Sequence, residues 1–134
     1  MKHFTIAELT DSTTARQNGI DNTPPESAVK ALQALVERVL DPLRDAWGKP
    51  ITVNSGYRCA ELNRKVGGAE QSQHLRGEAA DITAGSRADN RKLYELLRRL
   101  SLPLDQAINE RGYKWIHVSY TTRRHNRRQY LSIN

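Results

Sequence analysis

Apolar residues recur at helical spacing in two long segments of the chain. The first follows TPPE at Thr23–Glu26, which predicts a helix start because threonine can cap a helix, proline is tolerated in its first turn and glutamate stands at the third helical position. Pro42 is expected to end or kink this helix, with a further turn continuing to Gly48. The apolar stripe expected to face a core consists of Val29, Leu32, Leu35, Val36, Val39 and Leu40.

The second helical segment is SRADNRKLYELLRRL, residues 86–100. Ser86 and Asp89 form a capping pair at its start. Its apolar positions again follow helical spacing, at Leu93, Leu96, Leu97 and Leu100. A shorter helix is expected in CAELNRKVGG, residues 59–68, because two glycines close it.

Four short segments have the character of strands. They are PITVNSGYR (50–58), GEAADIT (77–83), KWIHVSY (114–120) and QYLSI (129–133). Strands and helices are mixed without a regular strand-helix-strand order, and no glycine-rich phosphate loop follows a strand. We therefore expect an α+β fold with a small antiparallel sheet packed with helices, in one domain over residues 1–134.

Pairing of two of these strands would bring three polar residues together. Asp81 and His117 each lie on one face of an alternating strand, and Gly77 argues against a helix through His74, which is therefore expected on a loop. Two imidazoles and a carboxylate suit zinc and leave a fourth position for water, which is typical of catalytic sites. The close His-x-Asp pair of non-haem iron sites is missing. The residues alone leave a second interpretation open, in which the histidine caps a turn and the aspartate holds a loop.

Composition limits the partners and the compartment. The chain has 21 basic and 15 acidic residues, a net charge of +6, with much of the excess in RRLSLP and TTRRHNRRQY. Such a surface either attracts polyanions or is a solvated, solubilising face. Because no aromatic residues are interleaved with RRHNRR, nucleic acid is not the expected partner.

Neither a membrane span nor a secretory signal peptide is recognisable in the sequence. No apolar run approaches the roughly 20 residues that cross a bilayer, and the start MKHFTIAELTDSTTAR lacks an apolar central region. We therefore expect a protein made in the cytoplasm without a signal peptide. Cys59 is the single cysteine, so it forms no internal disulfide and is interpreted as a packing residue. A monomer is expected, because no surplus apolar stripe requires a partner.

The segment SGYRCAELNRKVGGAEQSQHLRGEAADI, followed downstream by WIHVSY, resembles the M15 family of zinc peptidases, the D-alanyl-D-alanine carboxypeptidase group. The family pattern is Ser-x-His-x-x-Gly-x-Ala-x-Asp and then Trp-x-His. The matching residues are Ser72, His74, Gly77, Ala79, Asp81, Trp115 and His117. FTIAELTDSTTAR and GIDNTPP look like a subgroup associated with phages and prophages, so the resemblance covers nearly the whole chain.

This resemblance implies a hedgehog/DD-peptidase fold with a zinc ion held by His74, Asp81 and His117. It implies that the protein hydrolyses a D-alanine-containing peptide of bacterial peptidoglycan, with metal-activated water as the nucleophile. Arg58 matches a position where a guanidinium meets either the terminal carboxylate of the substrate or the developing oxyanion. Further contacts with the substrate are expected from Ser72, Tyr57 and Trp115.

The general base departs from the family pattern. Many members have an acid three residues before the final histidine, but Lys114 stands there in this chain. Glu110 is the nearest upstream acid and is our candidate for the base, with a surface carboxylate as the alternative. A second hypothesis therefore stays open, a non-catalytic cell-wall-binding module with a structural or vestigial metal site. Which peptide bond is cut is left open by the sequence.

Overall fold

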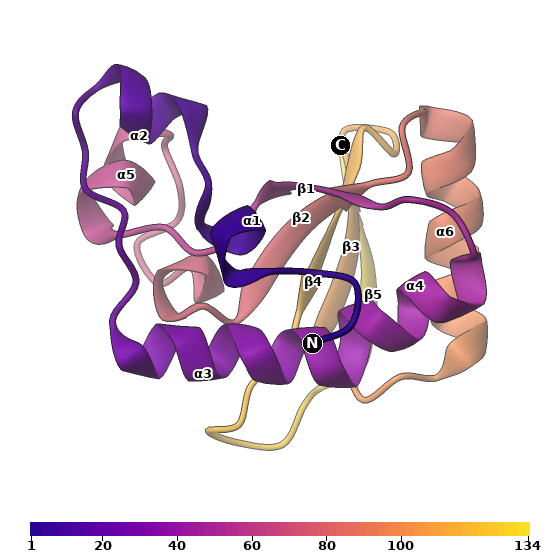
Figure 1. Cartoon of the computed structure of the whole chain (residues 1–134). Helices are drawn as coiled ribbons and strands as arrows, with labels where there is room; N and C mark the ends of the chain where they lie inside the picture. Colours follow the sequence, from indigo (N-terminus) through magenta and orange to yellow (C-terminus); the bar gives the residue numbers. More distant parts are fainter.

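A five-stranded sheet forms the centre of the structure, with strands in the order β1-β2-β4-β3-β5 (Figure 1). The computed structural model describes every residue from 1 to 134. The strands are β1 (Thr52–Ser55), β2 (Ala79–Thr83), β3 (Gln106–Glu110), β4 (Trp115–Ser119) and β5 (Gln129–Ile133). The expected α+β class is confirmed.

The sheet is mixed rather than wholly antiparallel. The pairs β1–β2, β2–β4 and β3–β4 are antiparallel, as expected, but β5 pairs parallel to β3. The reason is that the chain after β4 reverses and passes beyond the neighbouring strand β3 before it pairs again. The strand β3 was not expected from the sequence, since three consecutive buried residues at its centre hide the alternation of a half-exposed strand.

Helices surround this sheet. They are α1 (Ile6–Thr10), α2 (Thr13–Gln17), α3 (Glu26–Leu35), α4 (Asp41–Trp47), α5 (Ala60–Lys65) and α6 (Arg87–Leu100). A π-helical turn, Val36–Leu40, joins α3 to α4, and a 3₁₀ turn, Gln73–Arg76, precedes β2. In Figure 1, α2 and α5 lie together at the left end of the molecule, and α4 and α6 lie at the right.

The sequence made predictions about three helix boundaries, at Ser86, Thr23 and Pro42. Ser86 caps α6 as expected, because its side chain accepts a hydrogen bond from the Asp89 backbone N–H. Thr23 does not cap α3: its hydroxyl donates to the Asp21 carboxylate at 2.6 Å, and the cap position is Pro25. Pro42 does not end the helical run, which passes through the π-helical turn into α4.

The core lies between the sheet and the helices α3, α4 and α6. Twenty buried apolar residues form one cluster, which includes the predicted stripe from Leu32 to Leu40 but not its first residue, Val29, which is only partly buried. The sheet contributes residues that alternate along each strand, namely Ala80, Ile82, Ala107, Ile116 and Val118. The intervening residues of the same strands therefore face the opposite side of the sheet, away from this core.

Candidate metal centre

The side of the sheet away from the core carries a row of polar side chains at matching positions. In the sheet register Ser55 lies opposite Asp81, and Asp81 lies opposite His117. Because partners across a ladder point to the same face, Asp81 and His117 meet above the centre of the sheet. β2 and β4 therefore pair as the predicted site requires, with Asp81 and His117 on one face.

His74 completes the cluster from the 3₁₀ turn. Its Nε2 lies 3.3 Å from Asp81 Oδ1, and His117 Nδ1 lies 3.0 Å from the same oxygen. One ligand atom from each of the three residues can be chosen so that all lie within 4.8 Å of one another. The two imidazole rings meet edge to face, with centroids 5.1 Å apart. Two imidazole nitrogens and a carboxylate at this separation are a suitable donor set for zinc.

The orientation of the His74 ring is fixed by the loop after β1. His74 Nδ1 lies 2.7 Å from the Gly56 carbonyl oxygen and donates a hydrogen bond to it, which directs Nε2 toward Asp81. Gly56 tolerates no side chain here, because a Cβ would lie 2.0 Å from the Leu9 carbonyl oxygen. The His74 ring is 2% exposed, so this hydrogen bond is shielded from water.

Ser72 and Gly77 shape the two ends of the 3₁₀ turn. The Ser72 hydroxyl accepts a hydrogen bond from the His74 backbone N–H at 3.1 Å. Gly77 ends the turn with φ +73° and packs so closely on α3 that a Cβ would lie 2.5 Å from the Ala28 carbonyl oxygen. Ser72, predicted to contact substrate, therefore lies beside the metal cluster and holds the turn that carries His74.

Asp81 is ionised in this arrangement. Burial by itself would raise the pKa of its carboxyl, but hydrogen bonds with His117 and His74 outweigh burial and hold the pKa well below the usual range. A carboxylate rather than a carboxylic acid therefore stands between the two imidazoles. Such a group is ready to bind a cation without first losing a proton.

Arg58 is a cation without a partner near this cluster. Its Nε is buried and has no hydrogen-bond partner, and none of the ion pairs of the chain includes it. Burial lowers the pKa of the guanidinium, whereas the charges of Asp81 and Glu110 act in the opposite direction. A half-buried guanidinium with no protein partner is suited to bind an anionic ligand.

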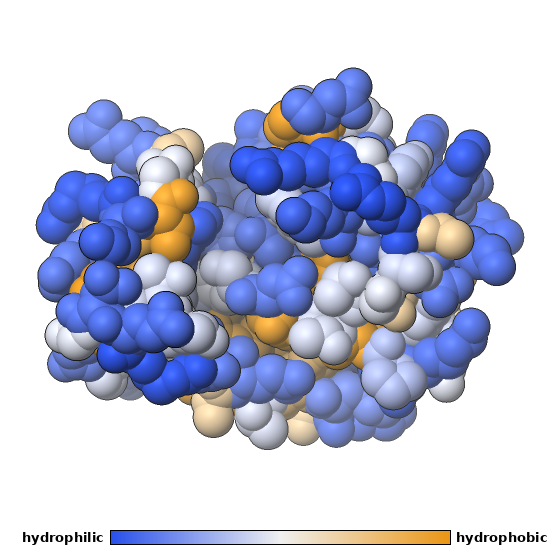
Figure 2. All heavy atoms as spheres, turned by 90° about the horizontal axis from the view of Figure 1, so that it is seen from above, coloured by the Kyte–Doolittle hydropathy of each residue, from blue (hydrophilic) through white to orange (hydrophobic).

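Arg58 also lines a cavity of about 280 Å³ between β1 and the helices α2 and α5. The other lining residues are Ser12, Thr13, Thr14, Asn54, Ser55, Leu62 and Val66. In Figure 2 the surface seen from above is mostly hydrophilic and is hollowed between the lobe at the left, where α2 and α5 lie, and the rest of the molecule.

Glu110 lies on the same side of the sheet as the metal cluster. It is opposite Trp115 in the register, and Trp115 precedes His117 by two residues on β4. Glu110 Oε2 accepts a hydrogen bond from the Trp115 indole N–H at 3.2 Å, so Oε1 stays available. Lys114, at the position where many family members have an acid, is exposed to solvent. Of these two residues, only Glu110 is partly buried and lies on the face of the sheet that carries His117.

The two aromatic residues expected at the substrate differ in position. Tyr57 is 7% exposed and belongs to the apolar core, where burial raises the pKa of its phenol. Trp115 is partly exposed, with the Arg111 guanidinium 5.3 Å from its ring centroid. Trp115 therefore has surface to offer to a ligand beside Glu110, whereas Tyr57 acts mainly in packing.

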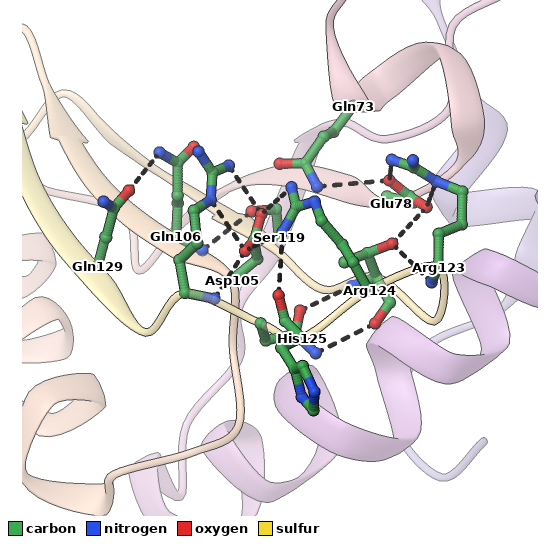
Figure 3. Close-up of polar contacts among 12 residues, drawn as sticks. Gln73, Glu78, Asp105, Gln106, Ser119, Arg123, Arg124, His125 and Gln129 are labelled. Atoms are coloured by element: carbon green, nitrogen blue, oxygen red, sulfur yellow. Dashed lines mark hydrogen bonds and ion pairs between the residues drawn. The ribbon is translucent and has the colours of Figure 1, made fainter.

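The basic segment after β4 is exposed, but three of its arginines are paired with buried acids. Arg123 pairs with the buried Glu78, and Arg124 and Arg127 pair with the buried Asp105. Figure 3 shows Arg123 and Arg124 turned toward these acids. The sequence left open a polyanion-binding surface or a solvated face. In the structure these three exposed arginines form ion pairs with buried acids. The cause is the presence of two buried carboxylates that need cationic partners.

Comparison with known proteins identifies a family that includes this chain. Residues 2–119 match the family model described as Peptidase M15. Over 86 residues the chain is 42% identical to a protein of Streptomyces albus G named zinc D-Ala-D-Ala carboxypeptidase. That alignment covers 63% of this chain and 32% of the relative, so the chain spans about a third of the relative's length. None of the helices combines the length and apolar character that crossing a bilayer requires.

Proposed function

We propose that this chain, which belongs to the peptidase M15 family, is a zinc-dependent peptidase that removes the terminal residue from bacterial peptidoglycan peptides ending in D-alanyl-D-alanine. The observation that carries the proposal is an unpaired, half-buried Arg58 beside a His74–Asp81–His117 cluster whose ligand atoms lie within 4.8 Å. One feature suits a metal and the other suits a carboxylate, and together they suit a peptide with a free C-terminus.

In this proposal each residue has a separate task. His74, Asp81 and His117 would hold the zinc, which would lower the pKa of a bound water to about 7 and polarise a carbonyl as a Lewis acid. Arg58 binds the terminal carboxylate of the substrate through its planar, five-donor guanidinium. Glu110 accepts the proton of the attacking water at Oε1 and afterwards transfers it to the leaving amine.

The substrate assignment comes from the named relative and from Arg58 together. A carboxypeptidase must recognise a free carboxylate, and Arg58 is a cation near the cluster that forms no ion pair with an acid of the chain. An endopeptidase has no such requirement. The proposed place of action is the bacterial cell wall, and the proposed working form is a monomer.

A second candidate function is a non-catalytic cell-wall-binding module. The observation that favours it is Lys114, exposed at the position where many family members have an acid. In this alternative the metal site is structural or vestigial, and Glu110 only orders the β3–β4 hairpin through its hydrogen bond to Trp115.

The test combines metal content with product release. The protein is purified without chelator or added metal, its zinc is measured, and free D-alanine released from a muropeptide ending in D-alanyl-D-alanine is assayed. We expect one zinc per chain and release that a chelator abolishes. Zinc without release of D-alanine or of any other peptide product would favour the binding module, and protein without zinc affinity would contradict both proposals for the site.

A further inference from the structure

The loop from Gly56 to Cys59 contributes two groups to the site, although it has no regular secondary structure of its own. The Gly56 carbonyl orients the His74 ring, and Arg58 is the unpaired cation of the site. An irregular segment of this kind holds one conformation only if its backbone groups find fixed partners elsewhere. The contacts of the loop therefore show what determines the position of the Arg58 side chain.

The side chain of Asn22 brackets Arg58. Its Nδ2 donates to the Tyr57 carbonyl oxygen at 3.0 Å, and its Oδ1 accepts from the Cys59 backbone N–H at 2.8 Å. The residues just before and just after Arg58 are thus both held by one amide group. A third hydrogen bond, from Nδ2 to the Thr10 carbonyl oxygen at 3.0 Å, fixes that amide to the end of α1.

Two backbone contacts complete the fixation. The Tyr57 N–H donates to the Leu9 carbonyl oxygen at 2.8 Å, and the Arg58 N–H donates to the His74 carbonyl oxygen at 3.0 Å. The second contact runs beside the hydrogen bond from His74 Nδ1 to Gly56, so the loop and the metal-ligand turn hold each other. Asn22 is the only side chain that bonds to the backbone of residues 57–59.

We propose that Asn22 is a positioning residue that sets the substrate preference of the site by holding the backbone on both sides of Arg58. The inference rests on the proposed function, because it takes Arg58 as the group that binds the terminal carboxylate. The proposal assigns a role to the segment GIDNTPP, which contains Asn22 and lies outside the metal motif. Asn22 is not one of the three metal-cluster residues and acts through the backbone of the loop that carries Arg58.

The chemistry of these three bonds requires a primary amide. Two carbonyl oxygens face Nδ2, which needs a donor there, and an N–H faces Oδ1, which needs an acceptor. Aspartate has the same shape as asparagine but offers only acceptors when ionised. Asn22→Asp therefore keeps the bond to Cys59 and turns the other two contacts into repulsion between oxygens.

The experiment compares Asn22→Asp with Asn18→Asp. Asn18 is exposed, and its Nδ2 donates to the Thr14 carbonyl oxygen, so this control makes the same chemical change on the same segment without touching the loop. Each protein is assayed on a peptide ending in D-alanyl-D-alanine and on the same peptide with an amidated C-terminus. Zinc content and hydrogen exchange of the Arg58 and Cys59 amides are measured in parallel.

For Asn22→Asp we expect the preference for the free carboxylate to fall by roughly tenfold or more, mainly through a higher KM, since small displacements of a binding group have effects of this size. Activity on the amidated peptide and zinc content should stay near those of the wild type. The Arg58 and Cys59 amides should exchange faster. Asn18→Asp should match the wild type in every measurement.

Two results would overturn the inference. One is an Asn22→Asp protein with wild-type preference and wild-type exchange. The other is an equal loss on both peptides together with loss of zinc, which indicates general damage to the fold. If the wild type itself releases no D-alanine, the proposed function fails, and the exchange of the Arg58 and Cys59 amides alone decides whether Asn22 holds the loop.

Discussion

Asp81 and Asp105 are both shielded carboxylates, and their surroundings differ in one decisive respect. Asp105 is fully buried and receives five hydrogen bonds, all from Arg124 and Arg127, at 2.8 to 3.1 Å. Asp81 contacts two imidazole nitrogens, both through Oδ1. Asp105 is thus neutralised by two arginines, which are always charged. Asp81 contacts two histidines, which carry a charge only when they are protonated.

The difference separates a structural acid from a functional one. At Asp105 burial would raise the pKa, but the two arginines and the Arg127 backbone N–H outweigh burial and hold the pKa well below the usual range. At Asp81 the pKa is also low, but Asp81 forms its close contacts with two histidines and no ion pair with an arginine or a lysine. A metal ion would supply the missing charge, and nothing at Asp105 requires one.

The largest expected effect comes from Asp81→Asn. The variant should lose zinc, and turnover should fall by on the order of a thousandfold or more, because a metal contributes several kcal/mol of transition-state stabilisation. The free energy of unfolding of the metal-free protein should fall by less than it does in Asp105→Ala, because the asparagine amide can still hydrogen-bond to the imidazoles. Metal analysis, D-alanine release and urea titration in chelator check the three statements. Retained zinc with full turnover would contradict the assignment.

Asp105→Ala should show the opposite pattern. We expect a loss of about 3 kcal/mol in the free energy of unfolding, at the low end for a broken buried pair, because Arg124 and Arg127 are 41% and 43% exposed and can turn to water. Zinc content and turnover per folded molecule should be unchanged. Urea titration measures the loss. Asp11→Ala, which breaks the exposed pair with Arg16, is the control and should cost less than about 1 kcal/mol. An Asp105→Ala protein as stable as this control would show that the arginine cluster does not hold the fold.

The sequence pattern indicated the cluster around Asp81 but gave no sign of the ion pairs around Asp105. The alternation in β2 and β4 was enough to place Asp81 and His117 on one face. The expected loop at His74 is instead a short 3₁₀ helix, Gln73–Arg76, which Gly77 ends. These inferences need only the two-residue period of a strand and the conformational freedom of glycine. The pattern brought the three residues together only if the two strands pair, and the resemblance to the M15 family was needed to assign them as metal ligands.

Contacts between distant segments were not accessible in this way. Arg124 and Arg127 read as surface charge because nothing near them in sequence shows that Asp105 is buried beside them. Asn22 and the loop at Arg58 are about 35 residues apart, and the bonds between them follow no period. The strand β3 was missed for a related reason, because Asn109 is buried next to Ile108, where a half-exposed strand would alternate.

Glu110→Gln tests whether the site that Asp81 anchors is catalytic. Zinc should be retained, and turnover should fall by about a hundredfold, the lower end for loss of a general base. The amide can still accept the hydrogen bond from Trp115, so the β3–β4 hairpin should be undisturbed. Glu95→Gln, on the exposed face of α6, is the matched control and should have full activity. Full turnover in Glu110→Gln would remove Glu110 from the mechanism.

The smallest expected effect is on the pH dependence of stability. Because the pKa of Asp105 is lower in the folded than in the unfolded protein, its contribution to stability is complete above about pH 5 and is lost as the pH falls below about 4, where the unfolded chain takes up the proton first. Glu78, whose pKa is also lowered despite its burial, acts in the same direction through Arg123. In Asp105→Asn the free energy of unfolding should therefore decrease less steeply between pH 5 and pH 3 than in the wild type, with both proteins measured in chelator so that Asp81 contributes equally. Identical slopes would mean that Asp105 has the same proton affinity in both states, and the contrast between a saturated structural acid and a metal-binding acid would then lose its electrostatic basis.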